Sequence, residues 1–408
     1  MTAEPVTLPR LRLGMVGGGP GAFIGAVHRM AARLDDDYDL VAAAPSSTAE
    51  NALQGGREMR LAADRIYTDY RAMAQAESQR PDGIEVVSVV VPNHLHLDVA
   101  RAFIEVGIHV ICDKPLTTNL ADGQKLLALA KQHHCRFALT HNYSGYPLVR
   151  AAREMIAAGR LGDIRVIQVE YAQAWLALPL EESGQKQAAW RTDPALSGPA
   201  GCLGDIGSHA AHLTEFVTGL RPHEISADLM HFVPGRRLDD HVQIQLRYAN
   251  GNAGAQTHAT NNASTSPATG ARGMLWASQV ATGEENGLRL RIYGSKAALR
   301  WQQELPNELW FTELGQPAQK LTRGMAALPA SAAAATRIPA GHPEGFIEAF
   351  AQLYKDFAGD LRRHQRGQAV VNSLVPSLEG GVRSLEFIEA TLLSHAQNAA
   401  WVTLPNND

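Results

Sequence analysis

Short apolar runs alternate with amphipathic stretches over the first third of the chain. The apolar runs are nearly continuous, which is typical of strands buried on both faces of a parallel sheet. The stretches between them carry apolar residues at helical spacing. The pattern predicts a doubly wound α/β domain with strands at "LRLGMV", "YDLVAAAP", "GIEVVSVVVPN", "GIHVICDKP" and "CRFALTHNY", and with helices at about 23–34, 95–106 and 120–133.

The pattern then changes to strands that follow one another with few helices between them. An open, mostly antiparallel sheet with one face packed on helices accounts for this order. We predict two domains, a dinucleotide-binding domain at 1–142 and an α+β domain at 143–408 whose C-terminal helix packs back on the first. The predicted strands of the second domain are 164–172, 224–232, 240–249, 272–280, 287–293 and 297–301.

A polar stretch of small residues, 249–271, interrupts this second set of strands. Its composition predicts a long hairpin insertion, because it offers too little apolar surface to pack. The alternative is a lid over a binding site.

Glycines follow the first predicted strand, in "GMVGGGPGAFIGAVH". Gly17 and Gly19 are followed by Ala22 at the third position of a dinucleotide fingerprint, and Gly25 lies three residues further on. Such a loop brings the backbone and a helix N-terminus close to a diphosphate, although a plain strand-to-helix turn is the alternative reading. The predicted contacts of the cofactor here are Gly17, Gly19, Gly21, Ala22, Phe23 and Ile24.

The residues at the end of the second strand do not decide between NAD and NADP, which differ by a phosphate on the adenosine ribose. Pro45 and Ser46 stand where an acidic residue usually binds the adenosine ribose of NAD, and no arginine follows immediately for NADP. Ser46 and Ser47 can hydrogen-bond either ribose. We expect NAD, with NADP as the alternative.

Polar residues also follow the later strands, at the edge of a parallel sheet where ligands bind. The expected cofactor contacts from these strand ends are Pro92, Asn93, His96, Asp113, Lys114 and Asn142. Lys114 stands out because Pro115 fixes the turn that carries it and cannot extend the ladder. We expect the lysine to project into a cleft at the nicotinamide end, although a surface lysine in an ordinary turn is equally compatible with this stretch alone.

A second group of polar residues lies in "SGPAGCLGDIGSHAAHL", where a Gly/Pro-rich loop leads into an amphipathic helix. Asp205 and His209 are four residues apart and therefore share a helical face, and His212 follows near it. A carboxylate beside an imidazole favours the cation, which suits a proton donor and acceptor. The alternatives are a structural contact or a metal site. Because no further ligand cluster is evident, we expect no metal.

The chain resembles the glucose-fructose oxidoreductase / inositol dehydrogenase / rhizopine catabolism (Gfo/Idh/MocA) family over nearly its whole length. The resemblance rests on "GAVH", "VVVPNHLH", "CDKPL", "AAGRLGDIRVIQ", "WRTDP" and "GDIGSHAAHL". It implies an N-terminal Rossmann domain, a C-terminal domain with a large open sheet, and NAD(P)-dependent oxidation of a secondary alcohol on a sugar, anhydrosugar or cyclitol. The family's Glu-Lys-Pro motif appears as Asp113-Lys114-Pro115. The family's Asp-x-x-x-His pair matches Asp205 and His209, and His212 stands where an acidic residue often follows three positions later.

The resemblance also implies roles for particular residues. His209 is the expected acid/base, and Asp205 orients and charge-stabilises it or binds a neighbouring hydroxyl. Lys114 hydrogen-bonds the reacting oxygen or moves the proton itself. The expected substrate contacts are Lys114, Tyr143, Trp175, Trp190, Arg191, Asp205, His209 and His212. Aromatic faces suit the C–H side of a sugar ring. Members acting on levoglucosan share the "WRTDP" and "GDIG" layout, while inositol or 3-keto-glycoside oxidation and a non-catalytic NAD(P)-sensing regulator are the alternatives.

Composition narrows the class of partner. The 408 residues carry a net charge of −4 and no basic stripe, so we expect no nucleic-acid partner. Three scattered cysteines do not form a disulfide framework or a thiolate metal site. The N-terminus lacks a signal-peptide pattern and no apolar run has the length of a membrane span, so we expect a cytoplasmic protein. Covering the open face of the sheet predicts a homodimer or homotetramer.

Overall fold

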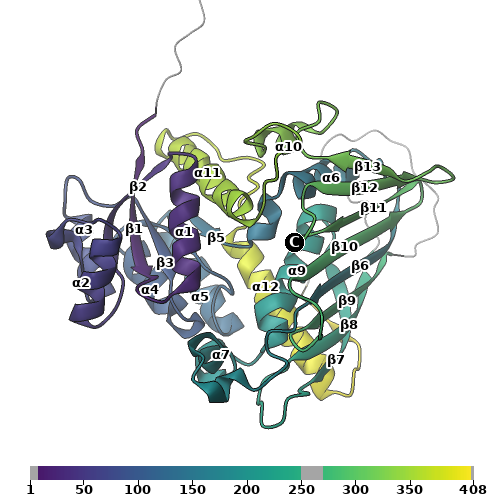
Figure 1. The fold of residues 1–408 in the computed structure, drawn as a ribbon, viewed down its shortest axis with the longest axis horizontal. Coiled ribbons are helices and arrows are strands. Elements are labelled where there is room, and N and C mark those ends of the chain that lie inside the picture. Colours follow the sequence, from purple (N-terminus) through teal and green to yellow (C-terminus); the bar gives the residue numbers. More distant parts are fainter. Residues whose placement is uncertain (1–7, 250–269, 406–408) are drawn as a thin grey trace, which may run out of the picture. The chain divides into compact units, whose positions relative to one another are not determined.

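A computed structural model describes residues 8–249 and 270–405 (Figure 1). The chain divides into two compact units that interleave in sequence. Unit 1 comprises Met1–Leu116, Asp122–Thr140 and Phe350–Leu378, and unit 2 comprises Thr117–Ala121, His141–Ala349 and Glu379–Asp408. The predicted insertion at 249–271 lies almost wholly outside the described residues. No helix in the described ranges is long and apolar enough to cross a membrane.

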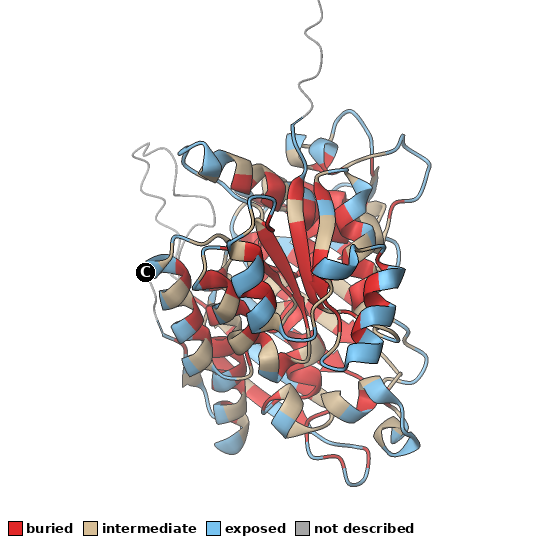
Figure 2. Cartoon of the chain, turned by 90° about the vertical axis from the view of Figure 1, so that its left-hand side faces the viewer, coloured by how far each residue is buried: buried red, intermediate tan, exposed pale blue. Residues whose placement is uncertain are grey.

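Unit 1 is built on a five-stranded parallel sheet with the strand order β2-β1-β3-β4-β5. Its middle strands are apolar on both faces; every residue of β3, for example, is buried. Helices therefore cover both faces, and Figure 2 shows the buried strands beneath helices whose outer surfaces are exposed. The strands are β1 (Leu11–Gly17), β2 (Tyr38–Ala44), β3 (Val86–Val90), β4 (His109–Cys112) and β5 (Phe137–Leu139). The predicted doubly wound parallel sheet is confirmed.

The helices of this region include two that the sequence pattern did not predict, α2 and α3. Two glycines in α2 lower its intrinsic helix propensity, so its helical signal is weak. Helix α3 begins where the Asp69 side chain accepts a hydrogen bond from the backbone N–H of Ala72. The helices are α1 (Phe23–Leu34), α2 (Ala49–Glu58), α3 (Tyr70–Ser78), α4 (His96–Ile104), α5 (Leu120–Gln132) and α11 (Phe346–Gln365).

Most of α11 belongs to unit 1, although it lies far along the chain from the rest of that unit. A buried polar cluster attaches it. The Tyr354 hydroxyl lies 2.7 Å from both His28 Nδ1 and Ser88 Oγ, and the Tyr38 hydroxyl donates to the Tyr354 carbonyl at 2.8 Å. Burial lowers the pKa of His28 to about 4, so this ring is neutral at physiological pH.

Unit 2 is built on a nine-stranded sheet with the order β13-β12-β11-β10-β6-β9-β8-β7-β14. All neighbours are antiparallel except β6 and β9. The strands are β6 (Ile164–Ala172), β7 (Pro222–Met230), β8 (His241–Tyr248), β9 (Arg272–Ser278), β10 (Gly287–Gly294), β11 (Ala297–Gln302), β12 (Glu308–Glu313), β13 (Gln319–Thr322) and β14 (Val402–Thr403). The large, mostly antiparallel sheet is confirmed. The strands β12, β13 and β14 were not predicted; β13 and β14 are short edge strands with four and two residues.

One face of this sheet carries the helices α6 (Pro147–Ala157), α9 (Ser208–Thr218) and α12 (Leu378–Ala396) (Figure 1). Strand β8 shows the reason. Its even-numbered residues Val242, Ile244 and Leu246 are buried, whereas Gln243 and Gln245 between them are exposed. Alternation with period two places one set on the helix-covered face and the other on the open face.

Candidate functional site

The glycine loop between β1 and α1 lies against the ends of the neighbouring strands. Gly17 has a φ of +83°, and a Cβ there would lie 2.1 Å from the carbonyl oxygen of Val90 at the end of β3. A Cβ on Gly25, in the first turns of α1, would lie 2.4 Å from the Cα of Gly18. Side chains are therefore excluded at both places. The loop and the helix pack as closely as a dinucleotide-binding turn requires.

The N-terminus of α1 is open to an anion. Ala22 occupies the N-cap and offers no side chain to the N–H groups of the first turn, which also carries no acidic residue. Uncapped N–H groups and the positive end of the helix dipole together favour phosphate. The local structure thus fits the diphosphate of a dinucleotide. Ser46 has a structural contact, since its hydroxyl accepts a hydrogen bond from Thr48 N, at the start of α2.

The turn that carries Lys114 is held by side chains of unit 1. One carboxylate oxygen of Asp113 accepts hydrogen bonds from the Thr140 hydroxyl at 2.7 Å and from the backbone N–H of Lys114 at 3.0 Å. The Lys114–Pro115 peptide bond is cis. Asp113 therefore connects the ends of β4 and β5 and orients the residue that follows it.

His96, the first residue of α4, reinforces the same edge of the sheet. Its buried ring lies between two carbonyl oxygens, with Nδ1 2.7 Å from Pro115 O and Nε2 3.0 Å from Val91 O. Burial lowers its pKa and favours the neutral ring, which has a single N–H and donates to one of the two carbonyl oxygens. His96 thus joins the segments that follow β3 and β4. Its contact with a cofactor stays a prediction, as do those of Pro92 and Asn93.

In unit 2, Asp205 lies in a π-helical turn, Leu203–Gly207, that runs directly into α9. Asp205 and His209 therefore lie on one helical segment that follows the Gly/Pro-rich loop, as the sequence pattern predicted. Such turns occur mostly as single insertions in helices and are frequent at functional sites. The Asp205 carboxylate accepts a hydrogen bond from Gln279 Nε2 at 2.8 Å and lies 3.7 Å from Arg191 Nε.

The start of this helical segment is bound by a buried carboxylate, Asp239, which is not among the predicted site residues. The two oxygens of Asp239 accept hydrogen bonds from the backbone N–H groups of Gly201 and Leu203, each at 2.7 Å. A Cβ on Gly201 would lie 2.3 Å from the carbonyl oxygen of Asp239. The pair therefore sets where the helix starts and, through it, the position of Asp205.

His209 lies among aromatic rings and is only 8% exposed. The ring of Tyr143 meets it edge-on at a centroid distance of 4.8 Å, and the ring of His141 does so at 5.3 Å. On its other side His141 stacks in parallel on His212, with centroids 4.1 Å apart. Burial lowers the pKa of His212 to about 4, which keeps that ring neutral at physiological pH.

Tyr143 also begins a directed chain of hydrogen bonds. Asn286 Oδ1 accepts from the Tyr171 hydroxyl at 2.7 Å and from Gln173 Nε2 at 2.8 Å. The Tyr171 hydroxyl has one proton, so it accepts from the neighbouring Tyr143 hydroxyl. Burial raises the pKa of both tyrosines and keeps both hydroxyls protonated. Tyr171 and Asn286 gave no sequence signal, because they lie on β6 and in the turn before β10.

The remaining predicted substrate residues lie on segments outside the sheet. In the short helix α7 (Lys186–Arg191), the Arg191 guanidinium covers the ring of Trp190 at 4.2 Å. Both side chains donate to Gln187 Oε1, Trp190 at 3.3 Å and Arg191 at 2.5 Å. Trp175 is half-buried in the loop after β6. Asn142 begins a short 3-10 helix, Asn142–Gly145, of unit 2, and its contact with a cofactor stays a prediction.

Two family models match the chain. Residues 11–141 match the model described as "Oxidoreductase family, NAD-binding Rossmann fold", and residues 149–300 match the "GFO/IDH/MocA C-terminal domain". Among curated proteins, the uncharacterized oxidoreductase YfiI of Bacillus subtilis is 34% identical over 98% of this chain and 99% of its own. Levoglucosan dehydrogenase of Pseudarthrobacter phenanthrenivorans is 26% identical over 74% of this chain and 76% of its own.

Solved structures agree with this likeness. An oxidoreductase from Sinorhizobium meliloti is 45% identical, with a TM-score of 0.85 over 97% of this chain and all of that one. An inositol dehydrogenase homolog from Azotobacter vinelandii, solved with NAD⁺, is 35% identical with a TM-score of 0.89 over 97% of each chain. The same homolog was solved with NADH and myo-inositol.

Proposed function

Because the chain belongs to the Gfo/Idh/MocA family of oxidoreductases and has an NAD-binding Rossmann domain, we propose that it oxidises a secondary alcohol of a sugar, anhydrosugar or cyclitol. The observation that carries the proposal is the placement of His209 and Asp205 on one continuous helical segment, with His209 enclosed by aromatic rings. A constrained imidazole close to an oriented carboxylate suits proton transfer to and from a hydroxyl.

The residues of unit 1 supply the cofactor side. The uncapped N-terminus of α1 and the loop Gly17–Gly19 would hold the diphosphate, while Ser46 and Ser47 would meet the adenosine ribose. NAD, when bound, supplies the group that accepts the hydride. NAD is favoured over NADP, because the relative with a TM-score of 0.89 was solved with NAD⁺ and no arginine follows Ser47 immediately.

Lys114 and His209 would share the work on the substrate oxygen. His209 accepts the hydroxyl proton during oxidation and returns it during reduction, and Asp205 keeps its imidazole oriented. Lys114, held by the Asp113 turn, donates a hydrogen bond that stabilises alkoxide character on the same oxygen. In this proposal Tyr143, Trp175, Trp190 and Arg191 contact the remaining hydroxyl and C–H groups, as does His212.

Among the candidate substrates, a cyclitol has the most support. The homolog solved with myo-inositol and NADH is 34% identical over 97% of each chain, whereas levoglucosan dehydrogenase matches at 26% over about three quarters of this one. The polar chain Tyr143–Tyr171–Asn286 and the neighbouring Gln173 also suit a ring that carries hydroxyl groups on every side. Levoglucosan, glucose and xylose are the comparison substrates.

The test is the absorbance of the reduced nicotinamide, recorded with NAD and with NADP against myo-inositol, scyllo-inositol, levoglucosan, glucose and xylose. We expect reduction of NAD with an inositol. His209→Ala and Lys114→Ala should each lower kcat by about 100-fold or more, with NAD affinity kept in the His209 variant. His134→Ala, on a turn outside the proposed site, serves as the control. Unchanged turnover in both variants would contradict the site.

A regulator that only senses the cofactor gives a different result. It would bind NAD and reduce none of it with any member of an extended polyol panel.

We also propose that the protein is a cytoplasmic homodimer or homotetramer. An assembly would cover Met274 and Tyr293, which are 42% and 40% exposed on the sheet. Light scattering at several protein concentrations measures the assembly, and a monomer at all of them would contradict it.

A further inference from the structure

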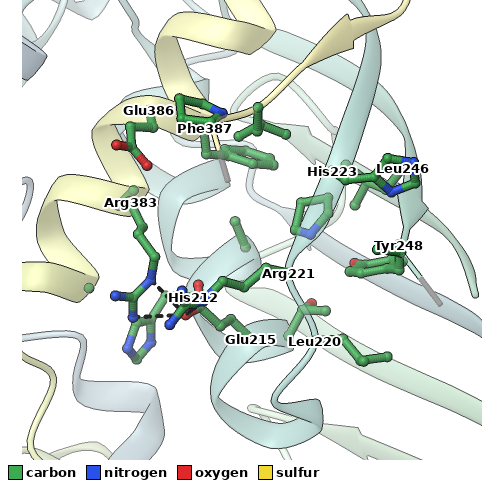
Figure 3. A pocket seen from close by; sticks show the side chains of 18 residues that line it. His212, Glu215, Leu220, Arg221, His223, Leu246, Tyr248, Arg383, Glu386 and Phe387 are labelled. Atoms are coloured by element: carbon green, nitrogen blue, oxygen red, sulfur yellow. Dashed lines mark hydrogen bonds and ion pairs between the residues drawn. The ribbon is translucent and has the colours of Figure 1, made fainter. Parts of the chain in front are cut away.

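Unit 2 contains a cavity of about 240 Å³ at the C-terminal part of α9 (Figure 3). Its walls come from α9, the turn into β7, strand β8 and helix α12. Among the described residues that line it, neither Asp205 nor His209 occurs. The proposed acid/base and its carboxylate therefore lie outside this cavity, whereas the predicted substrate residue His212 lies in its wall.

One end of the cavity carries more positive than negative charge. Oε1 of Glu215 accepts hydrogen bonds from Arg221 Nε at 3.0 Å and from Arg383 Nε at 2.9 Å, and Arg383 Nη2 lies 2.8 Å away (Figure 3). A single carboxylate thus faces two guanidinium groups. Each guanidinium has five N–H donors, so both keep donors for a second acceptor.

The other walls combine apolar and polar side chains, and two of the polar atoms lack partners. Leu246 and Phe387 are buried, and Leu404 closes the same side. Within the described part of the chain, Ser384 Oγ and His223 Nδ1 are buried without a hydrogen-bond partner, and both residues line the cavity. Buried polar groups normally find a partner, and the Ser384 hydroxyl gains one by rotating toward a ligand in the cavity.

We propose that this cavity binds a small organic monocarboxylate with an apolar body. Its carboxylate lies against Arg221 and Arg383 and accepts from the Ser384 hydroxyl, while its body packs on Leu246 and Phe387. Around Glu215 the two arginines exceed the negative charge by one. A second carboxylate in the lining, Glu386, repels a further negative charge and so disfavours a doubly charged ligand. The proposal does not rest on the dehydrogenase function, although the cavity shares His212 with the predicted substrate contacts.

A histidine in the wall makes occupancy observable. His212 lines the cavity and stacks on His141, whose ring contacts His209. A carboxylate bound near His212 changes the field at its imidazole. The side-chain NMR signals of His212, assigned with the His212→Asn variant, should therefore shift when the cavity fills.

The test is isothermal titration calorimetry of the full chain with sodium benzoate, using benzyl alcohol as the uncharged ligand of similar shape. We expect benzoate to bind with a Kd of about 1 mM or below, as ligand efficiency allows for so small a molecule. Benzyl alcohol should bind at least about tenfold more weakly. Arg221→Gln and Ser384→Ala should each weaken benzoate by about tenfold, whereas Arg165→Gln, an exposed arginine on β6 outside the cavity lining, should not.

Three outcomes would overturn the proposal. The first is the absence of binding at benzoate concentrations of about 10 mM. The second is equal affinity for benzoate and benzyl alcohol, which would mean that the arginines do not select the charge. The third is binding that survives Arg221→Gln, in a variant whose thermal midpoint is unchanged, but is lost with His209→Ala or with saturating NAD. That pattern would place benzoate in the catalytic site.

Discussion

The imidazole rings of His141 and His212 stack in parallel, with their centroids 4.1 Å apart and their planes only 5° apart. His212 was expected to contact the substrate, and the structure gives it a second role against His141. The edge of His141 then meets the ring of His209 at 5.3 Å. The stack therefore supports the histidine that we propose as the acid/base.

Removing one ring of this stack should impair turnover without removing the acid/base. We expect His212→Ala to lower kcat by about tenfold, because His141 and through it His209 lose a packing surface and misplacement of a catalytic group is costly. His212→Phe keeps a flat ring and should retain most of the rate. Steady-state kinetics of both variants with the identified substrate is the measurement. Equal rates for Ala and Phe would show that the stack does not position His209.

The turn at Lys114 depends on the carboxylate of the preceding residue, Asp113. Asp113→Ala removes the acceptor of the Thr140 hydroxyl and of Lys114 N. We expect kcat to fall by about tenfold, since the lysine loses its fixed orientation. Asp113→Glu carries the acid that the family uses at this place and should be the milder change. If Asp113→Ala has normal kcat, Pro115 and the neighbouring backbone suffice to hold the turn.

Glycine at position 25 should be essential for NAD binding. In Gly25→Ala the new Cβ would lie 2.4 Å from Gly18 Cα, so the glycine loop must move away from the helix. We expect the affinity for NAD to fall by at least about tenfold, because the backbone no longer approaches the diphosphate correctly. Gly359→Ala in α11, where a Cβ meets nothing within 4 Å, is the matched control. Fluorescence titration with NADH compares the two.

The stability of the protein should fall as the pH drops below about 6.5. His28 is buried with a pKa of about 4, below the value of 6.5 that it has when unfolded. Between these values the unfolded chain binds more protons than the folded chain, so stability is present above pH 6.5 and is lost as the pH falls toward 4. The free energy of unfolding should drop by about 2 kcal/mol from His28 between pH 7 and pH 5.

Urea unfolding at pH 7, 6 and 5 measures this loss. His109 and His212, whose pKa values burial also lowers to about 4, should add to it. His28→Asn removes the titrating group and should flatten part of the pH dependence, although it weakens the contact with Tyr354 at every pH. An unchanged slope in this variant would mean that His28 is not the group responsible.

The ionic contact between α9 and α12 should matter for stability. Glu215→Gln removes the carboxylate that both Arg221 and Arg383 contact, and leaves the partly buried guanidinium of Arg383 and the exposed guanidinium of Arg221 without it. We expect a loss of about 1–2 kcal/mol in the free energy of unfolding, more than an exposed pair gives. Glu313→Gln, whose partner Arg160 lies 3.9 Å away on the surface, should change it little. Equal effects of the two substitutions would contradict this.

The Rossmann half of the protein was predictable because its signals are local. The apolar run before Gly17, the glycines after it and the lysine–proline turn at Lys114 each lie within a few residues of one another. Such segments adopt their structure through backbone geometry and burial on both faces, which a single sequence reports directly. The strands of the parallel sheet and the glycine loop follow from them.

The sequence by itself determined the parallel sheet, the glycine loop and the Asp205–His209 pair, since all depend on neighbours along the chain. Only the tertiary structure decided what surrounds His209 and Asp205. Gln279 lies 74 residues beyond Asp205, and Asn286 lies 115 residues beyond Tyr171. Contacts of this kind arise when strands pair across the sheet and helices pack on it. A pattern read over one or two turns contains no information about such pairing.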